Sequence, residues 1–96
     1  MSQIINQIKT ELRGLENTVY KLKNDKANQA IYNKVLSKIN VAKQRVSKAE
    51  GIEKEIAKVI LKDVAKAAKL QKQMELEITR ATVAITEATI LIGTIK

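Results

Sequence analysis

The side chains of this sequence whose type and spacing could do chemistry are its lysines. Between Lys54 and Lys72 a lysine recurs every three or four residues, and a helix would gather these side chains on about a third of its circumference. Such a ladder of positive charge can lie along a phosphate backbone and displace its counterions. The residues that we expect to contact phosphate are Lys34, Lys38, Arg45, Lys48, Lys54, Lys58, Lys62, Lys66 and Lys69.

The overall charge indicates a class of partner without identifying one. The chain has 18 basic and 10 acidic residues and a formal net charge of +8 at pH 7, which favours nucleic acid, anionic lipid or an acidic protein surface. Arginines and tyrosines are few, so bidentate base contacts and stacking platforms are scarce, and any nucleic-acid binding is expected to be non-specific. A solvated lysine face that keeps a helix soluble is the alternative explanation.

The sequence lacks the side chains on which most enzymes depend. Without cysteine or histidine there is no thiolate nucleophile, no imidazole base and no ordinary zinc site. Glu53, Asp63 and Glu77 fall at or beside apolar seam positions, where an unpaired carboxylate is costly, so each needs a partner or water. The sequence therefore predicts a protein without enzymatic activity, metal or cofactor.

Apolar residues recur at helical spacing along nearly the whole chain. The first stripe consists of Ile5, Ile8, Leu12, Leu15, Val19 and Leu22. It predicts a helix over residues 2–23, and the interval 24–29 has no stripe and is rich in turn-forming residues, so we expect the main bend there. Further stripes predict a long helix over residues 30–95. Gly51 separates two stripes that are nearly in phase, so a break there and a continuous helix both fit the pattern.

Composition supports a helical fold with a thin core. The chain has no proline and three glycines, and only 2% of its residues are aromatic, so the interior must consist of Ile, Leu, Val and Ala. Aliphatic seams between long helices suit this inventory better than a globular core. We therefore expect one all-α domain over residues 1–96, either an elongated helical hairpin or a three-segment antiparallel coiled-coil-like bundle.

The C-terminal stretch is the most apolar part of the chain. A helix that is apolar nearly all round is normally buried on most sides, and in so small a chain we expect other subunits to cover it. The expected assembly face is Ile78, Ala81, Ile85, Ala88, Leu91, Ile92 and Ile95. Two alternatives remain open: the tail folds back on the chain's own first helix, or its many β-branched residues form a strand.

Insertion of this tail into a membrane is disfavoured. The run from Ala81 to Ile95 is shorter than the ~20 residues that span a bilayer, and Glu87 near its middle is unfavourable there. The N-terminus does not show the positive region and continuous apolar run of a signal peptide. A virion and the cytoplasm are both compatible with the sequence, and neither is indicated over the other.

Together these features favour a structural protein that self-assembles into a homo-oligomer or polymer and leaves its basic faces to a polyanion. The chain is similar in general character to the coat proteins of filamentous archaeal viruses, which are small, helical and basic, although it shares no motif with them. The assembling tail, the heptad seams and the lysine faces are the features from which we expect the role of a virion coat or a nucleoprotein filament. The alternatives are a helical protein–protein interaction module and a non-specific DNA-condensing protein.

Overall fold

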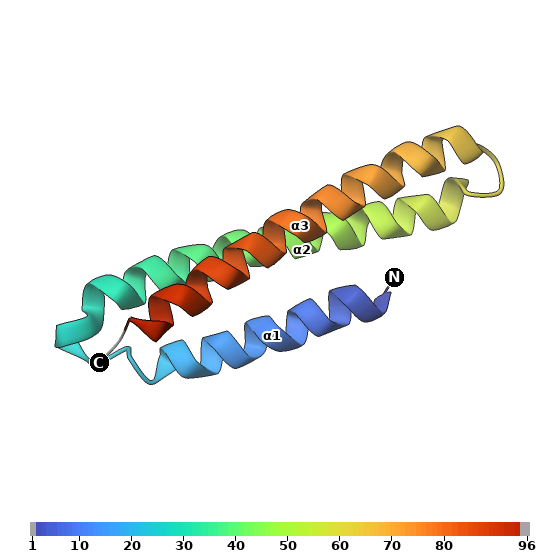
Figure 1. The fold of residues 1–96 in the computed structure, drawn as a ribbon. Helices are drawn as coiled ribbons and strands as arrows, with labels where there is room; N and C mark the ends of the chain where they lie inside the picture. Colours follow the sequence, from blue (N-terminus) through green and yellow to red (C-terminus); the bar gives the residue numbers. More distant parts are fainter. Residues whose placement is uncertain (1, 95–96) are drawn as a thin grey trace.

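The computed structural model describes residues 2–94, which form three α-helices in a narrow antiparallel bundle (Figure 1). The helices are α1 at Ser2–Tyr20, α2 at Gln29–Val59 and α3 at Val64–Gly93, and a short 3-10 helix, η1, occupies Lys26–Asn28. The principal extents of the molecule are 55 × 16 × 15 Å. The predicted all-α, elongated fold is confirmed.

The first helix buries the apolar stripe read from the sequence. Its buried side chains are Ile5, Ile8, Leu12 and Val19. α1 ends at Tyr20, earlier than the expected residue 23, and the chain reverses before α2 begins. Within the expected bend at 24–29, the Asp25 carboxylate accepts a hydrogen bond from the Ala27 backbone N–H at 3.1 Å and so caps η1.

The second helix passes through Gly51 without a break. No glycine among the described residues has a positive φ, and α2 continues to Val59. The chain reverses instead at residues 60–63, so neither an unbroken helix over 30–95 nor a bend at Gly51 is correct. A glycine in a regular helix lowers stability but does not by itself end the helix.

Backbone and side-chain hydrogen bonds hold the reversal between α2 and α3. The backbone N–H groups of Lys62 and Asp63 both donate to the Val59 carbonyl, at 2.9 and 2.7 Å. The Asp63 carboxylate then accepts from the Lys66 backbone N–H at 3.0 Å, which satisfies one of the free donors at the start of α3. Asp63 is therefore a helix cap, whereas the sequence pattern placed it beside an apolar seam.

The core is an aliphatic seam between α2 and α3, with α1 lying along part of it. Its largest fully buried side chains are Val19, Val35, Ile39 and Met74. Each such side chain contributes about 1.5–3 kcal/mol by leaving water. Among the described residues no polar or charged residue is buried as a whole. The seam matches the aliphatic inventory that the composition predicts.

Two ion pairs show how far α1 reaches along the hairpin. Lys9 Nζ lies 2.7 Å from Glu50 Oε2, and Lys43 Nζ lies 3.0 Å from Glu16 Oε1. In this antiparallel register α1, which starts at Ser2, continues past Glu50 toward the end of α2. Only the α2–α3 turn and the adjoining ends of the two helices project past α1, as a short two-helix arm (Figure 1).

The C-terminal segment is a helix in spite of its β-branched residues. Four threonine hydroxyls of α3 donate to the backbone carbonyl four residues earlier, each at 2.9 Å: Thr79, Thr82, Thr86 and Thr89. These bonds satisfy the hydroxyls without removing backbone groups from the helix ladder. α3 extends to Gly93, so the alternative of a C-terminal strand is wrong for the described part of the tail.

Candidate functional site

The face predicted for assembly is used inside the chain. Ala81, Ile85 and Ala88 are buried in the common core, and Ile78, Leu91 and Ile92 are partly buried against it. Ile95 lies outside the described residues. The tail therefore folds back on its own chain, but it packs mainly on α2 and less on α1, whereas the alternative left open by the sequence named the first helix. Burial of this face does not require a second copy.

A different apolar stripe of α3 faces outward. Leu76, Val83 and Ile90 are 49%, 51% and 63% exposed and follow one another at seven-residue steps. Seven residues are nearly two helical turns, so these side chains share one side of α3. We call Leu76, Val83 and Ile90 the outer stripe. Sequence analysis missed it, although the seven-residue spacing was a signal for it.

Side chains of α2 border the outer stripe. Val41 is exposed next to it, and two shallow hollows of about 380 and 260 Å³ lie between α2 and α3. The first is lined by Lys34, Ser37, Lys38, Glu87, Ile90 and Leu91, and the second by Lys38, Val41, Arg45, Thr79, Arg80, Val83, Ala84 and Glu87. Apolar side chains with charged neighbours are the usual arrangement of a helix-packing surface.

Three of the nine predicted phosphate-contacting residues are paired with acids. Lys38 lies 2.8 Å from Glu87, Arg45 lies 3.1 Å from Glu77, and Lys66 lies 3.9 Å from Glu55. The other six form no ion pair with residues 2–94: Lys34, Lys48, Lys54, Lys58, Lys62 and Lys69. Their ammonium groups are free to meet an external anion.

The lysines do not form the single ladder that the sequence suggested. Because the chain reverses at residues 60–63, Lys54 and Lys58 lie on α2, whereas Lys66 and Lys69 lie on the antiparallel α3. The ladder assumed one continuous helix, and its charges are instead divided between two antiparallel helices.

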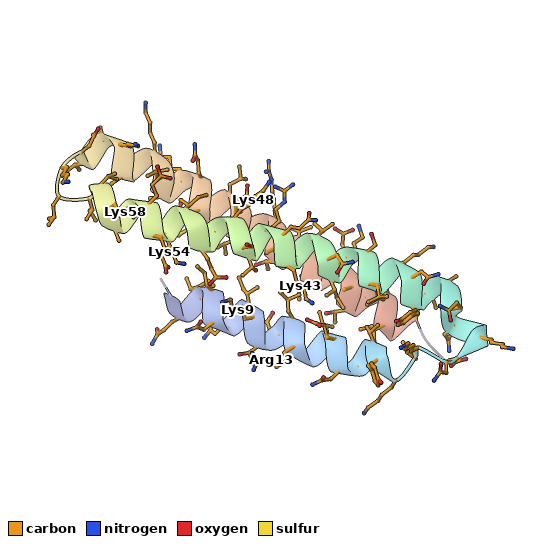
Figure 2. All side chains as sticks on the ribbon, turned by 180° about the vertical axis from the view of Figure 1, so that it is seen from behind. Lys9, Arg13, Lys43, Lys48, Lys54 and Lys58 are labelled. Atoms are coloured by element: carbon orange, nitrogen blue, oxygen red, sulfur yellow. The ribbon has the colours of Figure 1, made fainter. Side chains whose placement is uncertain are left out.

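Another basic surface combines α1 and α2. Figure 2 shows Lys9 and Arg13 on α1, Lys43 and Lys54 on the neighbouring stretch of α2, and Lys58 farther along α2 toward the turn. A hollow of about 320 Å³ lies between the helices, and the ion pairs Lys9–Glu50 and Lys43–Glu16 cross it. Sequence reasoning did not bring α1 into the basic face, because only the tertiary fold places Lys9 and Arg13 next to α2.

The three acids at or beside seam positions differ in whether their carboxylates have partners. The Glu77 carboxylate, with 13% of its side chain exposed, is held by Arg45 at 3.1 Å and by Arg80 at 3.5 Å. Asp63 caps α3. Glu53 Oε2 is buried and has no hydrogen-bond partner. The expectation that these acids need partners therefore holds for Glu77 and Asp63, and Glu53 is a local cost to stability.

Two further properties concern the part of the chain that the structure describes. Within residues 2–94, no group of three or more acidic, histidine or cysteine side chains is placed to hold a metal ion. None of the helices there is both long and apolar enough to cross a membrane.

Comparison with known proteins finds no matching family model, no similar curated protein and no similar solved structure.

Proposed function

We propose that this protein is a non-enzymatic structural protein that associates with further copies of itself through the outer stripe of α3. The observation that carries the proposal is the exposure of Leu76, Val83 and Ile90 at seven-residue spacing. Single exposed apolar residues are common on protein surfaces, whereas three at heptad spacing share one side of the helix and correspond to one of the two apolar positions of a coiled-coil heptad.

The stripe is suited to a symmetric contact. If two α3 helices pack antiparallel with Val83 at the centre, Leu76 of one copy meets Ile90 of the other, and Val83 meets its own equivalent. The same arrangement brings Arg80 of one copy near Glu87 of the other, so opposite charges border the apolar contact. A two-fold contact of this kind produces a dimer, and a filament or coat needs a second contact between dimers.

Sedimentation velocity tests the proposal. We expect the intact protein to sediment as a dimer or larger species, and Val83→Glu to raise the dissociation constant by about tenfold or more, since two carboxylates would enter the seam. Thr82→Glu is the matched control, because Thr82 is also exposed on α3 but faces another direction. Intact protein that stays monomeric at high concentration, or equal effects of the two changes, refutes self-association and favours the helical interaction module.

Binding of a polyanion such as nucleic acid is a second candidate function. It is supported by the six predicted lysines that form no ion pair with residues 2–94, whereas Lys9 and Lys43 on the face of α1 and α2 are already paired with Glu50 and Glu16. We expect duplex DNA to bind without sequence preference and with affinity that falls steeply as salt rises.

Lysine substitutions test the DNA-binding candidate. The double substitution Lys54→Gln and Lys58→Gln should make the plot of log affinity against log salt concentration less steep, by the slope that about one to two phosphate contacts contribute. Lys38→Gln should change it less, because Lys38 already faces Glu87. Absent or salt-insensitive binding removes this candidate and leaves self-association unaffected. DNA-dependent polymers would connect the two functions in a nucleoprotein filament or virion coat.

A further inference from the structure

The end of the two-helix arm carries an apolar cluster that the outer stripe does not explain. Leu61 is 96% exposed and Ile60 is 49% exposed within the segment that reverses the chain, and Val64, the first residue of α3, is 72% exposed. We call these three residues the tip. They lie at the extremity of the molecule, beyond the start of α1 (Figure 1).

The conformation of the turn does not require apolar side chains at the tip. The reversal is held by the Lys62 and Asp63 backbone donors to Val59 and by the Asp63 cap on α3. No described residue of the chain, including Leu61, has a positive φ. A polar residue at position 61 would therefore fit the same backbone conformation. The Leu61 side chain is not needed for the turn and is available for contact with another surface.

Lysines surround the tip on both helices. Residues 58–69 contain Lys58, Lys62, Lys66 and Lys69 but only one acid, a formal net charge of +3. That acid is Asp63, whose carboxylate is engaged at the start of α3. Lys66 also lies at 3.9 Å from Glu55, a long separation between two half-exposed side chains. The apolar tip is therefore surrounded by positive charge. We call Lys58, Lys62, Lys66 and Lys69 the lysine collar.

From this arrangement we propose that the tip docks into the surface of an anionic lipid bilayer. Leu61 and Val64 would enter the boundary between headgroups and acyl chains, and the lysine collar would lie at the level of the negatively charged headgroups. The contact is peripheral and does not require a spanning helix. It is independent of the self-association proposed for α3.

Charge distinguishes this partner from a second copy of the chain. A tip-to-tip contact between copies would bring the two lysine collars together, and like charges across an interface oppose association. A duplex nucleic acid matches the lysines but offers no apolar layer for Leu61. An anionic bilayer satisfies both features at once, and the projecting arm reaches it without interference from α1 (Figure 1).

A single tryptophan can report on insertion, because the chain contains none. We would prepare Leu61→Trp and add phosphatidylcholine vesicles with and without phosphatidylserine. The matched control is Tyr20→Trp, since Tyr20 is also exposed, lies beside Lys23 and stands at the opposite end of the bundle. We expect a blue shift and quenching by brominated lipid for Leu61→Trp with phosphatidylserine vesicles only, and neither effect for Tyr20→Trp.

Co-sedimentation of variants with the same vesicles measures the apolar contribution. Leu61→Ser with Val64→Ser should lower the partition coefficient by about tenfold or more, whereas Tyr20→Ser should leave it unchanged. Circular dichroism checks that the serine variants keep their helices, as expected for exposed positions.

Several outcomes would overturn the proposal. These are no binding to phosphatidylserine vesicles, equal binding of the serine variants and the intact protein, or equal spectral shifts at positions 61 and 20. A blue shift of Leu61→Trp that grows with protein concentration in the absence of vesicles would assign the tip to a second copy instead.

Discussion

Replacement of Gly51 by alanine tests the course of α2 directly. In the structure Gly51 lies within a continuous helix, at an exposed position, and a methyl group built there meets no other atom within 4 Å. Glycine in a helix interior costs about 0.8–1.0 kcal/mol relative to alanine, mainly because it loses more backbone freedom on folding. Gly51→Ala should therefore stabilise the protein.

The expected gain can be measured by thermal and urea unfolding. Because no clash subtracts from the gain and the position is far from both ends of α2, close to the full value of about 0.8–1.0 kcal/mol is expected. For a chain of this size that corresponds to a rise in Tm of about 4–8 °C. Circular dichroism at 222 nm follows both transitions.

The other glycines provide matched controls. Gly14 lies inside α1 with equally open surroundings, so Gly14→Ala should give a similar gain. Gly93 is the last residue of α3, where helix ends fray, so Gly93→Ala should give less. A fall in Tm for Gly51→Ala together with a rise for Gly14→Ala would mean that the chain bends at Gly51 after all.

Three other perturbations have defined outcomes. Arg45→Ala should lower the free energy of unfolding by about 1–2 kcal/mol because Glu77 is largely buried, whereas Lys38→Ala at the exposed Glu87 pair should cost under about 0.5 kcal/mol; urea unfolding that gives equal costs would contradict the difference. Glu53→Met should raise the same free energy by about 1 kcal/mol by removing an unpartnered buried oxygen, and a loss of stability would show that Glu53 has a partner in solution. Truncation after Arg80 should abolish cooperative unfolding, because Ala81, Ala84, Ile85 and Ala88 belong to the core; a folded, truncated chain that has only lost self-association would instead return assembly to the inner face of the tail.

Local patterns in the sequence predicted the helices better than the places where they end. Ile5, Ile8 and Leu12 identify the buried side of α1 because their spacing alone fixes which residues share a face. Across the α2–α3 turn, however, Ile56, Ile60 and Val64 keep four-residue spacing, so a hairpin and one long helix have the same pattern. The decisive local signal was Asp63 at the start of α3.

The candidate surfaces were harder to predict for a related reason. Periodicity showed that Ala81, Ile85 and Ala88 share a face of α3, but it does not tell whether the chain itself or another copy covers that face. Tertiary packing decides this, and it assigns the face to the core. The outer stripe and the tip are exposed because other apolar residues of α2 and α3 form the core.

The limited reach of α1 divides the molecule into parts with different cooperativity. Along the length of α1 each helix packs against two others, whereas the arm beyond the start of α1 has only α2 against α3. Segments with fewer buried neighbours open at lower free energy than the rest of a fold. We therefore expect amide hydrogens of the arm to exchange through local opening and those near Val35 and Ile39 to exchange only with global unfolding, which would place the tip on the part of the bundle that most readily adjusts to a surface.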